Sequence, residues 1–264
     1  MENQKLIGNP SSNPYRFSAA TIINRLAWDL KIQSWRSRKK LQKLRNQYCT
    51  QKAVILCNGP SLLKSDLHLL DNVFTFGLNK INLLFEKSSF RPSCIVSVNP
   101  LVLEQNADFY NKTSIPLFLD SAGTNIVRSR ENVVFLHSSM QSKFSRDVSI
   151  SLFYGYTVTY VAMQLAYHMG FEKVALIGCD HNFSTKGVAN STVVAGSQDK
   201  NHFDPKYFAD GVKWQLPDLA QSESAYAMAK NAYELTGRHI LNATEGGCLE
   251  MLPRVSLSEF VKEK

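Results

Sequence analysis

The chain has 264 residues, of which 44% are hydrophobic and 20% are charged, which is typical of a globular protein and not of a disordered one. No apolar run approaches the roughly 20 residues that cross a bilayer, and the polar, proline-containing first residues do not match a secretory signal. The five cysteines are dispersed and include no Cys-x-x-Cys pair, which favours reduced thiols in a cytoplasmic protein.

The net charge of +8 is concentrated near the N-terminus, where residues 20–46 hold eight basic residues and one acid, Asp29. We expect a leader over 1–18 and a basic amphipathic helix or helix pair over 19–47. Such a helix can lie on an anionic membrane, which would make the protein peripheral on the inner membrane face. It can also pack on the protein with a solvated basic face, or bind nucleic acid, the least favoured interpretation.

From Lys52 onward the pattern changes to alternating apolar strands and helices. Strands are predicted at 53–57, 73–78, 94–98, 116–119, 133–136, 174–178 and 239–241. Helices are predicted near 61–70, 80–87, 101–110, 157–169 and 222–236. The alternation predicts an α/β, Rossmann-like domain with a mostly parallel sheet flanked by helices. We therefore divide the chain into an N-terminal extension, 1–48, and an α/β domain, 49–264.

The first predicted strand ends in the motif Asn58-Gly59-Pro60-Ser61. Gly59 allows a ligand to approach the backbone closely, and Pro60 suits the first turn of a helix. The Ser61 hydroxyl and the free N–H groups of that turn favour an anion. Because ligands of open α/β sheets bind at the carboxyl ends of strands, the motif predicts a phosphate-bearing ligand. A plain capped turn is the alternative.

Other strand ends repeat this polar theme. Asn79, Asn99 and Asp180 each follow an apolar strand, and asparagine can both donate to and accept from a neutral nucleoside. Each of them alone is equally well explained as a cap or turn former. Thr157 and Thr159 open a predicted helix, where they can hold a phosphate or serve as an ordinary N-cap.

The segment 182–217 interrupts the strand–helix rhythm with glycines, prolines and interleaved aromatic residues. A connection of this length predicts a substrate-covering lid, with a disordered insertion as the alternative. His202 lies inside it and suits a general base for an acceptor hydroxyl, although a loop histidine is often only a surface residue. His181 is a further polar contact or a metal ligand.

The common metal and nucleotide motifs are missing from the sequence. There is no HExxH, no Cys/His set at zinc spacing, no DxD pair, no GxGxxG with a downstream acid and no GxxxxGK[ST]. We therefore expect no resident metal and no cofactor.

Together these motifs resemble the bacterial CMP-sialic acid-dependent sialyltransferases. The resemblance covers 52–183 in order and 200–255 more loosely, and its matching motifs are Ile55–Leu62, Asn79, Asn99-Pro100, Glu104-Gln105, Thr157-Val158-Thr159, Gly170–Val174 and Ile177–Asp180. The ending Asn242–Gly247 is more similar to the motility accessory factor and 6-hydroxymethylpterin diphosphokinase-like (MptE-like) family. Both families share an α/β nucleotide-binding core, which implies a variant GT-A-like sialyltransferase fold.

The resemblance implies roles for particular residues. The nucleotide-binding set is Asn58, Gly59, Pro60, Ser61, Asn79, Asn99, Thr157, Thr159, Gly178 and Asp180. His202 is the implied general base, and Gln105, His181 and Tyr207 are candidate donor or acceptor contacts.

The implied activity is a metal-independent glycosyltransferase. It would move a nonulosonate, such as sialic acid or a Kdo-like sugar, from a CMP donor to a glycan or lipid-linked acceptor in lipopolysaccharide or capsule biosynthesis. The alternatives are an MptE-like ATP-dependent phosphotransferase and a non-catalytic nucleotide-binding protein.

Overall fold

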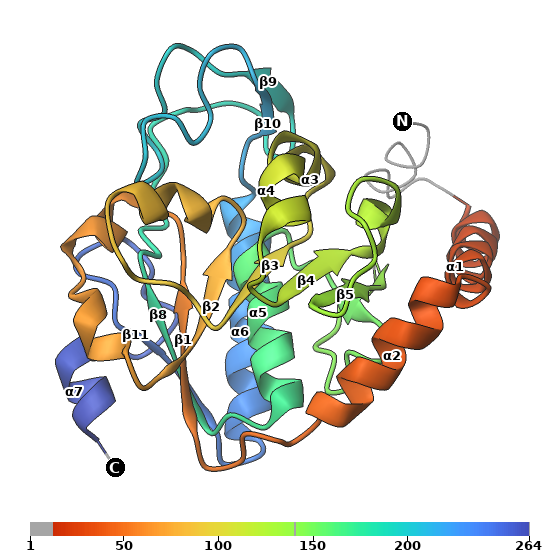
Figure 1. The fold of residues 1–264 in the computed structure, drawn as a ribbon, viewed down its shortest axis with the longest axis horizontal. Helices are drawn as coiled ribbons and strands as arrows, with labels where there is room; N and C mark the ends of the chain where they lie inside the picture. Colours follow the sequence, from red (N-terminus) through yellow and green to blue (C-terminus); the bar gives the residue numbers. More distant parts are fainter. Residues whose placement is uncertain (1–12, 140, 264) are drawn as a thin grey trace.

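A computed structural model describes residues 13–139 and 141–263 (Figure 1). Its centre is a seven-stranded sheet in the order β11-β8-β1-β2-β3-β4-β5, with every neighbouring pair parallel. The strands are β1 (Lys52–Leu56), β2 (Phe74–Leu78), β3 (Cys94–Ser97), β4 (Leu117–Asp120), β5 (Val133–Leu136), β8 (Lys173–Ile177) and β11 (His239–Asn242). The predicted Rossmann-like α/β fold is confirmed, and all seven predicted strands are present.

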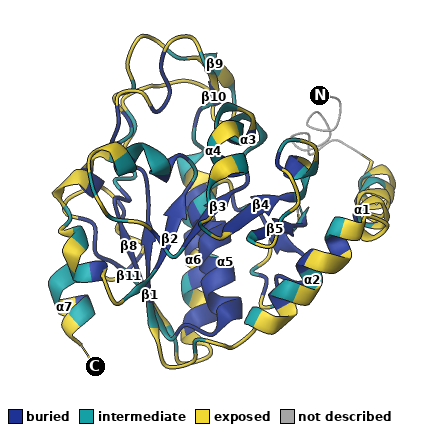
Figure 2. Ribbon diagram, in the orientation of Figure 1, coloured by how far each residue is buried: buried dark blue, intermediate teal, exposed yellow. Residues whose placement is uncertain are grey.

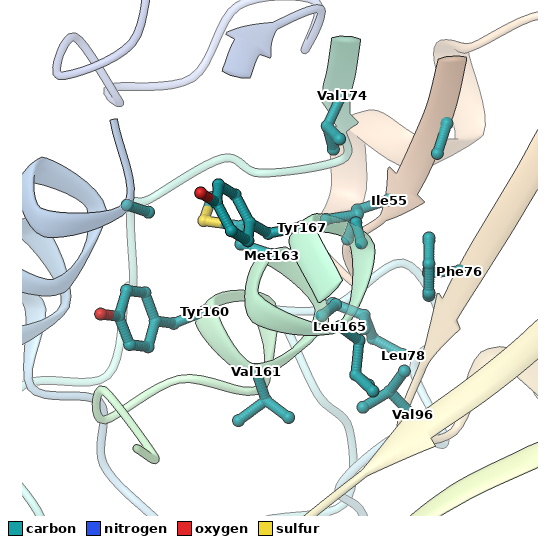
Figure 3. Close-up of a cluster of buried hydrophobic side chains, with 14 of the residues drawn as sticks. Ile55, Phe76, Leu78, Val96, Tyr160, Val161, Met163, Leu165, Tyr167 and Val174 are labelled. Carbon is teal, nitrogen blue, oxygen red and sulfur yellow. The ribbon is translucent and has the colours of Figure 1, made fainter. Parts of the chain in front are cut away.

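Alternate residues along the strands enter two separate cores, one on each face of the sheet. On one face Ile55 and Phe76 pack against α5 (Val158–Met169), which has α6 (Leu219–Glu234) beside it. Figure 3 shows Leu165 of α5 beside Leu78 and Val96 of the strands, whereas Tyr160 is turned to the other side of the helix. Helix α5 is buried on nearly all sides, which explains its almost continuously apolar sequence.

The opposite face is covered mainly by short helices. Two 3-10 helices, η2 (Pro60–Lys64) and η3 (Leu67–Leu70), replace the helix predicted near 61–70, and η4 (Ile81–Glu86) replaces that near 80–87. The division between η2 and η3 has a local cause. The Asp66 side chain accepts a hydrogen bond from the backbone N–H of His68 and so starts a new turn.

The helix predicted near 101–110 is also divided. It becomes α3 (Pro100–Gln105) and α4 (Ala107–Lys112), because Asn106 leaves the helical region between them with φ −112° and ψ 15°. Two further short helices lay outside the predictions, η5 (Ser121–Asn125) and α7 (Leu257–Lys262).

The N-terminal extension is a helix pair, α1 (Pro14–Asp29) and α2 (Ile32–Leu44), as predicted. The helical region starts earlier than expected: Asn13 caps α1, so residues 14–18 are helical and not a leader. The rest of the expected leader lies outside the described residues. Helix α2 packs along the edge strand β5, where the Ser37 hydroxyl accepts a hydrogen bond from the Phe135 N–H.

The segment 182–217 folds back on itself beyond the carboxyl ends of the strands (Figure 1). Its short strands β9 (Thr192–Val194) and β10 (Lys213–Gln215) form an antiparallel pair. Another small pair, β6 (Ser138–Ser139) and β7 (Leu152–Phe153), lies near the β5 edge. None of the helices in the described ranges has both the length and the hydropathy to span a membrane.

Candidate functional site

The strand order changes direction between β1 and β8, because the chain runs from β1 to β2 on one side while β8 lies on the other. The two strand ends are tied together by the Gly59 N–H, which donates to the Gly178 carbonyl at 2.9 Å. Gly178 adopts the left-handed region at φ +67°, and there a side chain would also press on the backbone of Cys57. Crevices at such switch points are where open α/β sheets bind ligands.

At this switch point the Ser61 donors are already taken by a carboxylate of the protein. Asp180 Oδ2 accepts from the Ser61 hydroxyl at 2.7 Å and from the Ser61 N–H at 3.2 Å. A Cβ on Gly59 would lie 1.9 Å from the same oxygen, so Gly59 makes room for Asp180. The carboxylate therefore occupies the place where the sequence predicted a phosphate.

The strand-end asparagines lie at one edge of the sheet, as their spacing required, but they have different partners. The Asn79 side chain accepts from the Ser97 hydroxyl at 3.2 Å. The Asn99 side chain caps α3 and donates to Gln215 Oε1 at 3.1 Å. Buried Asn58 Oδ1 has no hydrogen-bond partner among the described residues, so it is the strand-end oxygen best placed to accept from a ligand.

The start of α5 lies beside the end of β1, because the Thr159 hydroxyl is 3.5 Å from Cys57 Sγ. Thr157 is an N-cap whose hydroxyl accepts from the Thr159 N–H at 3.3 Å. The structure thus brings the threonine pair to the switch point. The Thr157 cap can hold a phosphate only by exchanging this intrahelical bond for one to the ligand.

His181 lies next to Asp180 with φ +52°, and its Nε2 is 2.9 Å from Glu223 Oε1 of α6. His181 therefore has a hydrogen-bonding partner within the protein. Among the ranges 13–139 and 141–263, no group of three or more His, Cys, Asp or Glu side chains is arranged to hold a metal ion.

His202 forms a partly buried pair with Asp199, which the sequence analysis did not single out. His202 Nδ1 is 2.7 Å from Asp199 Oδ2, and the Asp199 side chain is only 2% exposed. Burial raises the pKa of the Asp199 carboxyl, but the hydrogen bond and charge of His202 outweigh it, so the pKa lies below its ordinary value. The sequence signal for this pair was an aspartate three residues before a histidine, which is too common a local pattern to predict the contact.

Aromatic side chains hold the His202 ring in place. The ring stacks on Tyr207 at 4.0 Å between centroids with an interplanar angle of 1°, while Phe208 and Trp214 meet it edge-on. Burial raises the pKa of the Tyr207 hydroxyl, which has no hydrogen-bond partner in the described part of the chain. The aromatic residues of segment 182–217 thus form a packed cluster.

This segment is fastened to the strand ends at several points. The Phe203 N–H donates to the Asn58 carbonyl at 2.9 Å, beside the switch point. Farther along the edge, the Gln105 side chain donates to the Lys213 carbonyl at 2.7 Å. The segment therefore covers the carboxyl edge of β1–β3, and the predicted contact residues Gln105 and Tyr207 both lie beneath or within it.

Lys80 was also missed by the sequence analysis. Its Nζ donates to the Tyr207 carbonyl and to Gln105 Oε1, each at 2.7 Å, and lies 4.7 Å from the centre of the Phe208 ring. Burial lowers the pKa of Lys80 to about 8, and the negative charge of Asp199 opposes part of that change. A lysine directly after a strand-end asparagine gave no sequence signal for this role.

Two cavities of different character are present. One, of about 170 Å³, lies inside the folded segment and is lined by Asp199, Asn201, Phe208 and Trp214 among others. The other, of about 200 Å³, lies near the starts of β2 and β3 and is lined by Val73, Ser93 and their neighbours. The first adjoins the His202–Asp199 pair, whereas the second is at the edge of the sheet where α/β proteins do not carry out chemistry.

Residues 30–186 match the family described as 6-hydroxymethylpterin diphosphokinase MptE-like. The chain belongs to this family. This membership confirms the predicted resemblance to the MptE-like and motility accessory factor group. Comparison with curated proteins gave no match.

A solved structure, that of a MAf glycosyltransferase from Magnetospirillum magneticum AMB-1, is similar to this chain with a TM-score of 0.51 and 16% sequence identity. The similarity covers 86% of this chain and 39% of that one, so this chain spans about two-fifths of the length of its structural neighbour. At this identity the likeness establishes a shared fold.

Proposed function

We propose that this chain is a glycosyltransferase that takes a sugar from a nucleotide-activated donor, with His202 as the general base. The observation that carries the proposal is the partly buried His202–Asp199 pair, which directly precedes Phe203, whose N–H donates to the Asn58 carbonyl beside the switch point. Membership of the MptE-like family and a fold shared with a protein named as a glycosyltransferase support it.

In the proposed reaction Asp199 holds the proton on His202 Nδ1, which leaves the Nε2 lone pair free to accept. Nε2 takes the proton of an acceptor hydroxyl as the acceptor oxygen forms a bond to the anomeric carbon. The bond from that carbon to the nucleotide phosphate breaks, and the phosphate leaves with the electron pair. Asp199 stabilises the imidazolium that results.

The proposed nucleotide position follows from the charges at the switch point. Asp180 favours hydroxyl donors over a second anion, so we place the ribose near Asp180 and the free Asn58 oxygen. The phosphate then lies toward the start of α5, where Thr157 and Thr159 supply hydroxyls and N–H groups. This replaces the Ser61 phosphate contact that the sequence predicted.

The finer proposal is a CMP-linked nonulosonate donor, a metal-independent transfer, and a glycan or lipid-linked acceptor of lipopolysaccharide or capsule biosynthesis. It is supported by the Asn58, Asn79 and Asn99 strand ends and by the sialyltransferase-like order of motifs.

A thermal-shift panel of CMP, CDP, UDP, GDP and ATP, each with and without Mg²⁺, tests the nucleotide. A ligand that binds only the folded state adds about 2.7 kcal/mol to the free energy of unfolding when its concentration is 100 Kd. The melting temperature rises as a result. We expect CMP or CDP to stabilise the protein without Mg²⁺. Stabilisation by ATP only with Mg²⁺, together with AMP release in the presence of 6-hydroxymethylpterin, would replace the proposal with the diphosphokinase activity of the family description.

The His202→Gln variant tests the base. Loss of a general base reduces turnover by about 10²–10⁴-fold, so release of CMP from a CMP-nonulosonate should fall by that factor while the nucleotide-induced thermal shift is kept. His68→Gln, at an exposed histidine of η3, is the matched control and should keep full turnover. Equal turnover in both variants would remove His202 from the mechanism.

A further inference from the structure

The apolar side of α1 faces away from the protein. Five residues form what we call the apolar stripe: Tyr15, Ile22, Ile23, Leu26 and Leu30, with Leu30 88% and Tyr15 83% exposed. At 100° per residue they fall within roughly 100° of the helix circumference, so they make one continuous face. Figure 2 shows α1 as largely exposed, whereas Trp28 on the other side of the helix is buried.

The start of α2 also carries exposed apolar side chains, with Ile32 60% and Trp35 64% exposed. Seven large apolar side chains on two consecutive helices are more than the scattered surface residues of ordinary proteins. A contiguous face of this kind indicates a binding surface and not a folding defect, since the buried side of the same helix pair packs normally through Trp28 and Leu41.

Basic residues flank this face. On α2, Arg36, Lys39 and Lys43 lie on the same side of the helix as Ile32, and all three are exposed. Within the described residues, none of the three has an acidic partner at salt-bridge distance, and Lys39 lies over the Trp35 ring at 5.4 Å. The charge on this side of the extension is therefore positive and uncompensated.

We propose that the α1–α2 face is a docking surface for an anionic lipid bilayer. The apolar stripe and Trp35 would enter the boundary between headgroups and acyl chains, and Arg36, Lys39 and Lys43 would contact the phosphates of the lipid headgroups. Charge decides between this occupant and a second copy of the chain, because a second copy would bring the same positive charge to the contact. The proposal is independent of the transferase activity.

The test uses the full chain and sedimentation with vesicles of phosphatidylcholine alone or with about 30% phosphatidylglycerol, an anionic lipid. The variant I22S/L26S/L30S changes only exposed side chains, as does R36Q/K39Q/K43Q. The matched controls are L235S, at another exposed leucine, and K112Q/R128Q/K262Q, at three exposed basic residues elsewhere. Circular dichroism spectra and melting temperatures check that each variant is folded.

We expect the wild type and both controls to bind the anionic vesicles, and binding to weaken as salt is added. Removing the three basic charges should weaken binding about a hundredfold, since each is worth about fivefold, and the serine variant should lose at least about tenfold. Equal binding by the variants and their controls would overturn the proposal. An absence of vesicle binding would also overturn it. In that case, a dimer that dissociates in I22S/L26S/L30S and in no other variant would assign the face to a second copy of the chain.

Discussion

The candidate site depends on which nitrogen of His202 carries the proton, and one residue controls this. Asp199 is almost fully buried and accepts the Nδ1–H, and it is itself fixed by the N–H groups of Asn201 and Phe208 at 2.7 and 3.1 Å. A carboxylate with three donors around it keeps its charge, so the ring is held in one tautomer with Nε2 as the acceptor.

We therefore expect the Asp199→Asn variant to fold normally and to lose transferase activity. The amide is nearly isosteric, but it can present its NH₂ group to His202 and favour the wrong tautomer. We expect kcat to fall by about 10²–10⁴-fold with little change in KM. The activity–pH profile gives an independent measure, because a merely structural role for Asp199 would leave its shape unchanged. Turnover within about twofold of the wild type would refute the assignment.

At the scale of elements, the turn from β1 into η2 is built around the approach of Asp180. The place where a Gly59 side chain would lie is taken by the Asp180 carboxylate and the Gly178 carbonyl. The sequence motif predicted the close approach of a ligand, whereas the group that approaches Gly59 in this structure is the side chain of Asp180, just after β8.

Gly59→Ala should destabilise the protein. The new methyl group would lie 1.9 Å from Asp180 Oδ2 and 2.7 Å from the Gly178 carbonyl oxygen, and overpacking of this kind costs about 1–3 kcal/mol. Urea unfolding measures the change in the free energy of unfolding. Gly196→Ala serves as the control, because a methyl group added there would meet no other atom within 4 Å and no loss of stability is expected. A Gly59 variant as stable as this control would contradict the crowded geometry.

On the scale of the whole molecule, the N-terminal extension is joined to the sheet through a buried histidine after β5. His137 Nε2 lies 3.2 Å from Asn24 Oδ1, and its ring stacks near Trp28 at 6.4 Å. Burial, helped by the positive charge of Arg25, lowers the pKa of His137 to about 4. The extension is thus docked onto a neutral imidazole.

The stability of the docked protein should fall as the pH falls from 6.5 toward about 4. In that window the unfolded chain binds a proton at this histidine and the folded chain does not, so protonation favours unfolding. Urea unfolding midpoints measured at about pH 7 and about pH 5 should drop more for the wild type than for His137→Gln. The same drop in both proteins would show that another group carries the dependence.

The sequence by itself determined the fold class, the seven strands and the edge where polar strand ends gather. These follow from local patterns, because strand periodicity and parallel connection fix which ends share an edge. It also determined that the segment 182–217 departs from the strand–helix rhythm and that His202 lies within it.

Only the tertiary structure decided the partners of those residues. It paired Asp180 with Ser61 over 119 positions, brought Lys80 under Tyr207 from 127 positions away, and turned the apolar face of α1 outward. Hydrogen bonds and burial depend on distance in space, and long loops place few constraints on which distant groups meet. For that reason the sequence named candidate residues at the strand ends but not the contacts that each of them makes.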